Sequence, residues 1–215
     1  MSGLAFAYQK SSSSPVPVVS TALIGKSTTI RVGDILILTE ASALTTSATP
    51  VVRPYFSGDT ITSSNGVLGV ALFDISTNSS GVLQSVASPV TVSTRGQLDT
   101  SLPLTNVLPS DPVTGFVQIY YATFDPDNVF RGYSATNDVV SFYQVGRKAG
   151  ATASAASAPA NYTIDLNATA ANCPFIIDGV DTESPQYNSA NGGGEVFVRC
   201  LQAFNQGITG TLWAT

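Results

Sequence analysis

Residues 66–98, GVLGVALFDISTNSSGVLQSVASPVTVSTRGQL, constrain the fold of this chain more than any other stretch. Residues 67–73 are apolar throughout, which is typical of a β-strand that is covered on both faces. In residues 90–95 the side chains alternate with a period of two, as a strand with one buried and one solvated face requires. A Ser/Asn/Gly turn lies between the two segments. The stretch therefore predicts a β-scaffold, and it contains no evident reaction site.

The rest of the chain repeats this pattern of short strands. Further strand-like segments are expected at 35–38, 116–124, 139–145, 161–167 and 195–204. Turn residues such as Gly33-Asp34 and Asn65-Gly66 recur at close intervals between them. No segment has a convincing helical period. The sequence therefore predicts an all-β protein.

Composition divides the chain into four parts. Residues 1–27 contain a serine run and two prolines, so we expect an extended arm without a core of its own, which either orders on a partner or stays a disordered tail. A β-domain follows at 28–147. Residues 148–160, KAGATASAASAPA, indicate a flexible linker more than a short Ala-rich helix. Residues 161–215 are expected to form a C-terminal β region that pairs with the first domain or stands apart.

Charge and hydropathy narrow the expected partners. The formal charge of −5 argues against a nucleic-acid binder, because neutralising phosphates requires clustered lysine and arginine. Residues 1–53 carry +2 and the remainder −7, so a partner that docks on the N-terminal quarter would be acidic. No apolar run approaches the roughly 18 residues of a membrane helix. The apolar run at 4–8 is too short for a secretion signal, so we expect synthesis in the cytoplasm and no membrane contact.

The sequence contains no histidine, which excludes Ser-His-Asp triads, Cys-His pairs and His-ligated zinc. Cys173 and Cys200 are too few for a cysteine-only zinc site. We expect them to be buried thiols, and a disulfide between them stays open. Gly25-Lys26-Ser27 matches the end of a phosphate-binding loop, but Ser20 stands where the motif requires glycine. We therefore expect no catalytic residue, no cofactor and no resident metal.

Two acidic clusters and one aromatic cluster have open interpretations. The oxygen ligands of residues 125–128 suit calcium, although Phe130 replaces the glycine of an EF-hand and an Asx/Pro turn is the alternative. Asp178, Asp181 and Glu183 are either paired carboxylates of a glycosidase or solvated turn residues. The aromatic cluster belongs to the core or to a protein contact, and it comprises Tyr120, Tyr121, Phe124, Phe130 and Tyr133 beside Arg131.

Three segments carry a resemblance to a known family: Val32-Gly33-Asp34-Ile35, Val67-Leu68-Gly69-Val70-Ala71, and residues 90–96. Through them, residues 28–98 resemble the capsid decoration (cement) proteins of tailed bacteriophages. The resemblance covers about a third of the chain. It implies a small β-barrel or β-tulip-like domain behind an N-terminal arm, with additional C-terminal β-strands in this chain. It also implies copies on the outer capsid surface at or near three-fold positions.

The expected function is thus that of a non-enzymatic virion protein that binds the outside of an assembled phage capsid and stabilises it. Its expected partners are the major capsid protein and further copies of the chain, with a trimer favoured. The expected capsid contacts come from the arm and the basic residues near it: Leu4, Phe6, Tyr8, Lys10, Val16, Val18, Lys26 and Arg31. The alternative is a carbohydrate- or receptor-binding β-module of a phage tail or cell surface, which would use Tyr120, Tyr133 and the 125–128 loop.

Overall fold

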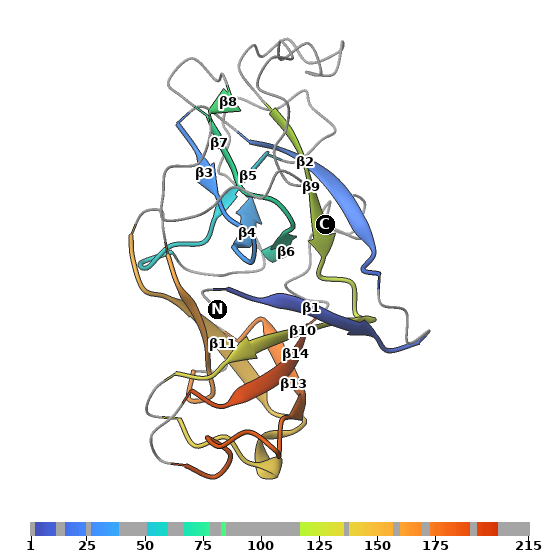
Figure 1. Ribbon diagram of the computed structural model, residues 1–215, viewed down its shortest axis with the longest axis vertical. Helices are drawn as coiled ribbons and strands as arrows, with labels where there is room; N and C mark the ends of the chain where they lie inside the picture. The colour runs from blue at the N-terminus through green and yellow to red at the C-terminus, as the bar shows by residue number, and fades with distance from the viewer. Residues whose placement is uncertain are drawn as a thin grey trace, which may run out of the picture.

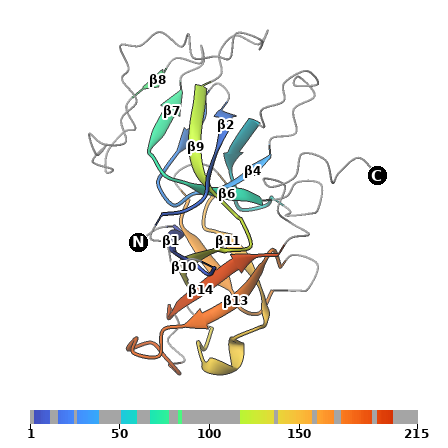
Figure 2. The same cartoon turned by 90° about the vertical axis from the view of Figure 1, so that its right-hand side faces the viewer.

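The computed structural model describes residues 3–11, 16–24, 27–38, 51–59, 67–77, 83–84, 117–135, 138–156, 160–168, 173–189 and 193–201. These residues form strands, one short 3-10 helix and no α-helix, so the predicted all-β class is confirmed. The strands build two units that lie one above the other along the long axis of the molecule (Figures 1 and 2).

The upper unit is a closed five-stranded barrel, which confirms the predicted barrel. Its strand order is β2-β5-β4-β6-β9, and β2 and β5 pair in parallel while the other neighbours are antiparallel. The barrel strands are β2 (Val19–Ile24), β5 (Val51–Pro54), β4 (Ile35–Leu38), β6 (Val67–Ala71) and β9 (Val117–Thr123). A small sheet of order β3-β7-β8 flanks them, with β3 (Thr29–Ile30), β7 (Ile75–Thr77) and β8 (Leu83–Gln84).

Alternation along the barrel strands separates an inner from an outer face. On β9, Tyr121 is buried in a cluster with Leu36, Val52 and Leu68, whereas the adjacent Tyr120 is exposed. All five residues of β6 are buried, because one face lines the barrel and the other packs against the lower unit. The apolar run at 67–71 thus forms the strand covered on both sides that its sequence predicts.

The lower unit is a six-stranded antiparallel sheet of order β1-β10-β14-β13-β11-β12. Its strands are β1 (Ala5–Gln9), β10 (Asn128–Tyr133), β14 (Glu195–Cys200), β13 (Phe175–Val180), β11 (Lys148–Ala153) and β12 (Tyr162–Asp165). The sheet curls so that β12 returns to the end of β10. There Ser134 forms a parallel bridge with Ile164, and the backbone N–H of Ala135 donates to the Ile164 carbonyl at 3.1 Å.

One apolar core joins the two units. It includes Ile35 and Val70 from the outer face of the barrel, together with Phe130 and Phe175 from the sheet. Phe124, which follows β9, makes edge-to-face ring contacts with both phenylalanines, at centroid distances of 5.0 and 5.3 Å. The aromatic cluster expected around β9 and β10 is therefore largely core, with Tyr120 as an exposed exception.

The N-terminal segment differs from the predicted arm. β1 pairs with β10, and β2 pairs with β9 and β5, so residues 5–9 and 19–24 belong to the two units. The serine and proline run that indicated an arm lies between these strands in the sequence. Such a run breaks regular structure locally, and it says nothing about the apolar strands on either side of it.

The predicted linker and one predicted strand are also corrected. Residues 148–153 are strand β11, with Ala149 and Ala153 buried in the shared core. Small side chains are typical of flexible segments, but here they belong to a strand that pairs with β12 and β13. The segment 139–145, predicted as a strand, instead contains the 3-10 helix η1 (Phe142–Gln144). Strand β10, assigned to the first domain, pairs with β14 of the C-terminal region.

Candidate functional site

Two of the predicted capsid contacts belong to the protein's own core. The Leu4 side chain is 2% exposed, and its backbone N–H donates to the Gly33 carbonyl at 3.0 Å. Phe6 is half-buried, with its ring 6.1 Å from that of Phe130. The sequence assigned both side chains to a partner contact, because an arm without a core of its own would leave these apolar groups exposed. Pairing of β1 with β10 uses them internally instead.

Lys10 is engaged in an ion cluster within the chain. Its Nζ donates to Asp178 Oδ1 at 2.7 Å, and Arg199 Nε donates to the same oxygen at 3.0 Å. Burial alone would raise the pKa of Asp178, but the hydrogen bonds from Lys10 and Arg199 outweigh it, so the pKa lies below its ordinary value. A general acid of a glycosidase needs the opposite shift. The arrangement therefore suits a structural ion pair between the N-terminal segment and the sheet.

A group of exposed apolar side chains lies on the barrel; we call Val16, Val18, Val19 and Tyr120 the barrel patch. Val19 lies opposite Ala122 and Thr21 opposite Tyr120 in the β2–β9 pair, so part of the patch shares one outer face. Tyr8 is also partly exposed, with its ring 6.3 Å from that of Phe197. Among the predicted contacts, Tyr8, Val16 and Val18 are thus accessible to a partner.

The remaining predicted contacts are Lys26, which lies outside the described residues, and Arg31. Arg31 begins the turn before β4, where its N–H donates to Asp34 Oδ2 at 2.8 Å and the Asp34 N–H donates to the Arg31 carbonyl at 2.9 Å. The Arg31 Nε is buried without a hydrogen-bond partner in the described part of the chain. Burial raises the pKa of Asp34 to about 7, although the hydrogen bond and charge of Arg31 oppose the rise.

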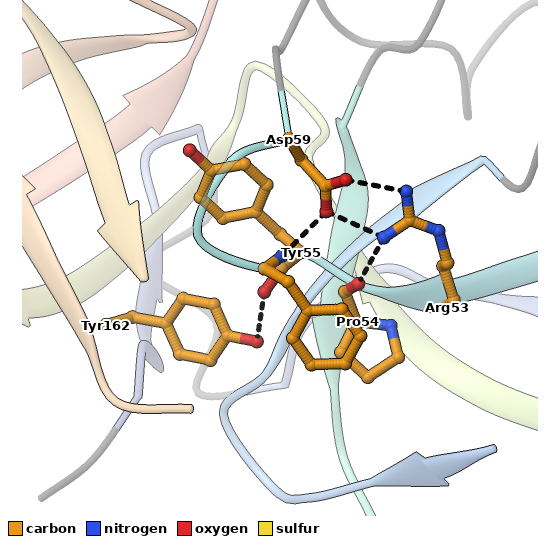
Figure 3. Close-up of polar contacts among 6 residues, drawn as sticks. Arg53, Pro54, Tyr55, Asp59 and Tyr162 are labelled. Carbon is orange, nitrogen blue, oxygen red and sulfur yellow. Dashed lines mark hydrogen bonds and ion pairs between the residues drawn. The ribbon is translucent and has the colours of Figure 1, made fainter. Parts of the chain in front are cut away.

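A polar cluster that sequence reasoning missed stabilises the junction of the two units (Figure 3). Arg53 binds Asp59 through both terminal nitrogens, at 2.6 and 2.8 Å. These hydrogen bonds lower the pKa of Asp59 against the opposing effect of burial. The Tyr162 hydroxyl of β12 donates to the Tyr55 carbonyl at 2.8 Å. The cluster therefore links the end of β5 to the lower unit. The sequence does not indicate this link, because Tyr55 and Tyr162 are far apart in the chain.

In the 125–128 loop, the polar side chains that suggested a calcium or glycan site form hydrogen bonds within the chain. In the 125–128 loop, Asp125 Oδ1 accepts the Asp127 N–H at 2.9 Å, which is an Asx turn. Asn128 is fully buried, and its Nδ2 donates to the Thr123 carbonyl at 2.8 Å. Of the other residues of the predicted glycan site, Tyr120 lies on β9 of the barrel and Tyr133 on β10 of the sheet.

Cys173 and Cys200 are both buried thiols, so the disulfide that the sequence left open is not formed. The Cys173 Sγ donates to the Ala168 carbonyl at 3.4 Å, and the Cys200 Sγ to the Leu201 carbonyl at 3.4 Å. Burial raises the pKa of both thiols. A thiol with a raised pKa is a poor nucleophile at neutral pH, which fits a packing role.

Among the described residues, the most exposed aromatic side chains lie at the end of the lower unit, in a segment of residues 139–148 that we call the tip. Its 3-10 helix, drawn in gold, is at the bottom of Figures 1 and 2. Phe142 is 66% and Tyr143 85% exposed, and Val139 and Val145 are partly exposed. The sequence did not indicate the tip, because the apolar residues of 139–145 fit the pattern of a half-buried strand. The adjacent Arg147 and Lys148 were the available signal of a surface position.

Within the described ranges, no set of three or more cysteine or acidic side chains is placed to hold a metal ion. No helix among the described residues has the length and apolar character needed to cross a membrane. Comparison with protein-family models, with curated proteins and with solved structures found no match. The functional argument therefore rests on the chain's own geometry.

Proposed function

We propose that this chain is a structural virion protein that binds the outer surface of an assembled phage capsid and stabilises it. The supporting observation is that two segments of the cement-protein resemblance lie side by side. Ile35 pairs with Val70 and Leu36 with Gly69. The Ala71 N–H also donates to the Asp34 carbonyl at 3.0 Å. They thus form adjacent strands of one barrel wall, while the third segment, 90–96, lies outside the described residues.

The shared core of barrel and sheet suits a protein that stiffens a shell. A protein that stiffens a shell must not deform at the contact, and close-packed interiors have low compressibility. Here Phe124, Phe130 and Phe175 connect barrel and sheet through one core, and the Arg53–Asp59 pair lies at the same junction. The molecule is therefore built as one body, which favours transmission of force between its two ends.

The proposed partners are the major capsid protein and further copies of this chain, arranged as a trimer on the outside of the virion. Many copies on a symmetric lattice support one another, so the affinity of each single contact need not be high. Since Leu4 is buried in the protein's own core, the contact must come from accessible side chains. Among the described residues, the barrel patch and the tip are two accessible apolar surfaces that meet this requirement.

Co-sedimentation with capsids tests the proposal. Purified protein at micromolar concentration is mixed with expanded, undecorated capsids of the phage that encodes it, and the capsids are pelleted. We expect saturable co-pelleting with expanded capsids and weaker binding to unexpanded precursors, whose lattice differs. A serum albumin control measures trapping. Protein that remains in the supernatant at every capsid concentration would overturn the proposal.

A further inference from the structure

We infer that the tip, residues 139–148, is the surface by which this chain docks on an acidic, partly apolar face of a protein partner. The inference rests on the proposed function, in which that partner is the capsid shell, and it names the contact that the proposal leaves open. Three properties of the tip carry it: its exposed aromatic side chains, the hydrogen bonds that fix its backbone, and its local charge.

The apolar surface of the tip is unusual for a solvated loop. Phe142 and Tyr143 are adjacent and are 66% and 85% exposed, and Val139 and Val145 flank them. Single exposed apolar residues are common, but adjoining aromatic rings mark interaction sites. When such rings enter a pocket of a partner they become dominant contributors to binding, and their truncation weakens binding strongly.

The tip is held in one conformation before any partner arrives. The Phe142 N–H donates to the Tyr187 hydroxyl at 3.2 Å, and the Asn188 N–H donates to the Val140 carbonyl at 2.8 Å. Val140 itself is fully buried. At the other end, the Gly146 N–H donates to the Ile177 carbonyl at 2.8 Å. A preformed loop loses little conformational entropy on binding, which favours recognition of a shaped protein surface.

The charge of the tip is opposite to that of the whole chain. Arg147 and Lys148 form the only adjacent basic pair in the sequence, and no acidic residue occurs between Asp138 and Asp165, whereas the chain carries −5. Both basic side chains are exposed, and the four ion pairs found among the described residues involve other cations. Charge complementarity therefore points to an acidic partner.

The loop at 181–189 packs beside the tip and contains two acidic residues, Asp181 and Glu183. Asp181 Oδ1 accepts the Glu183 N–H at 3.0 Å, which holds that carboxylate within its own loop. Two cations attract an anionic lipid surface only weakly, and stable membrane binding takes clusters of roughly four to eight basic residues. A rigid aromatic pair with two cations thus fits a protein surface better than a bilayer.

Paired variants test the inference on the same capsids. The variant F142S/Y143S removes the aromatic rings, and R147S/K148S removes the basic pair. The control is V32S, which changes an exposed apolar side chain outside both the tip and the barrel patch. We expect F142S/Y143S to bind capsids at least about tenfold more weakly. R147S/K148S should bind more weakly at low salt and lose much of the salt dependence. V32S should bind like the wild type, and all variants should melt at the wild-type temperature because the changed side chains are exposed.

The outcomes separate the two claims. Wild-type protein that does not pellet with capsids would overturn the proposed function and this inference together. Wild-type binding that both tip variants retain would overturn the inference alone. A parallel arm uses vesicles of phosphatidylcholine and phosphatidylglycerol. Vesicle binding that disappears in F142S/Y143S, with capsid binding intact, would assign the tip to lipid and also overturn the inference.

Discussion

At the scale of single residues, Gly69 shows why one segment of the resemblance has its sequence. A Cβ at this position would overlap the carbonyl oxygen of Ala122 and the ring of Tyr121. Strand β6 and strand β9 therefore approach at a distance that glycine alone permits. The sequence placed a strand here, but the need for glycine became visible only with the partner strand.

Substitution of Gly69 by alanine should destabilise the fold strongly. The new methyl group meets backbone atoms, which cannot move without shifting the barrel wall, so we expect a loss of about 3 kcal/mol or more in the free energy of unfolding. Gly179→Ala is the matched control, because its Cβ would make ordinary contacts at 3.6 and 3.8 Å with Phe197. Chemical denaturation of both variants measures this difference. Equal free energies of unfolding for the two variants would contradict the close approach of β6 and β9 at Gly69.

Asp34 makes stability depend on pH in the direction opposite to most carboxylates. Burial raises its pKa to about 7, from an ordinary value of 3.8. The folded state therefore favours the protonated form. Its contribution to stability is fully present below the unfolded pKa, and it is lost as the pH rises through about 7.

The free energy of unfolding should accordingly fall between about pH 4 and pH 7, by at most about 1.4 kcal/mol per pH unit from this group, and level off above the folded pKa. The chain has no histidine, so the upper part of that window is free of histidine titration. In Asp34→Asn the amide oxygen still accepts from Arg31, and we expect a flat profile that matches or exceeds the wild type at pH 8. Urea denaturation at several pH values measures this. Parallel profiles for the two proteins would contradict a buried, titrating Asp34.

At the scale of elements, period-two patterns predicted many strands correctly and failed where flanking composition dominated the interpretation. Tyr162, Ile164 and Leu166 are buried as their alternation predicts. Residues 148–153 were assigned to a linker because small residues and one proline follow one another, although their pairing with β12 and β13 makes them a central strand. Pairing across long sequence separations is decided by the whole sheet, and local composition does not report it.

The N-terminal segment gives the sharpest test at this scale. An arm could be removed without loss of the fold, whereas deletion of residues 1–21 from this structure removes β1 and half of the β2–β9 pairing. We expect the truncated protein to be unfolded or aggregated, by circular dichroism and gel filtration. Lys10→Ala is the mild control, since the Lys10–Asp178 pair is half exposed and contributes at most about 1 kcal/mol. A truncated chain that still melts cooperatively would restore the arm interpretation.

At the scale of the whole molecule, the sequence predicted the fold class and the barrel. It also assigned Leu4 and Phe6 to a docking arm because they are apolar, whereas the structure buries Leu4 and packs the half-buried Phe6 against the core. The sequence did not predict the exposed tip, because the exposure of Phe142 and Tyr143 depends on hydrogen bonds with residues 187–188. These residues lie about forty-five positions away in the chain. Sequence patterns identify which residues are apolar, but tertiary structure decides which of them remain exposed.

Cryo-electron microscopy of capsids incubated with the protein shows directly whether this molecule binds the outside of a capsid. We expect added density on the outer surface, at or near three-fold positions, into which the barrel and sheet fit with the tip against the shell. A reconstruction of saturated capsids without added outer density would contradict the claim.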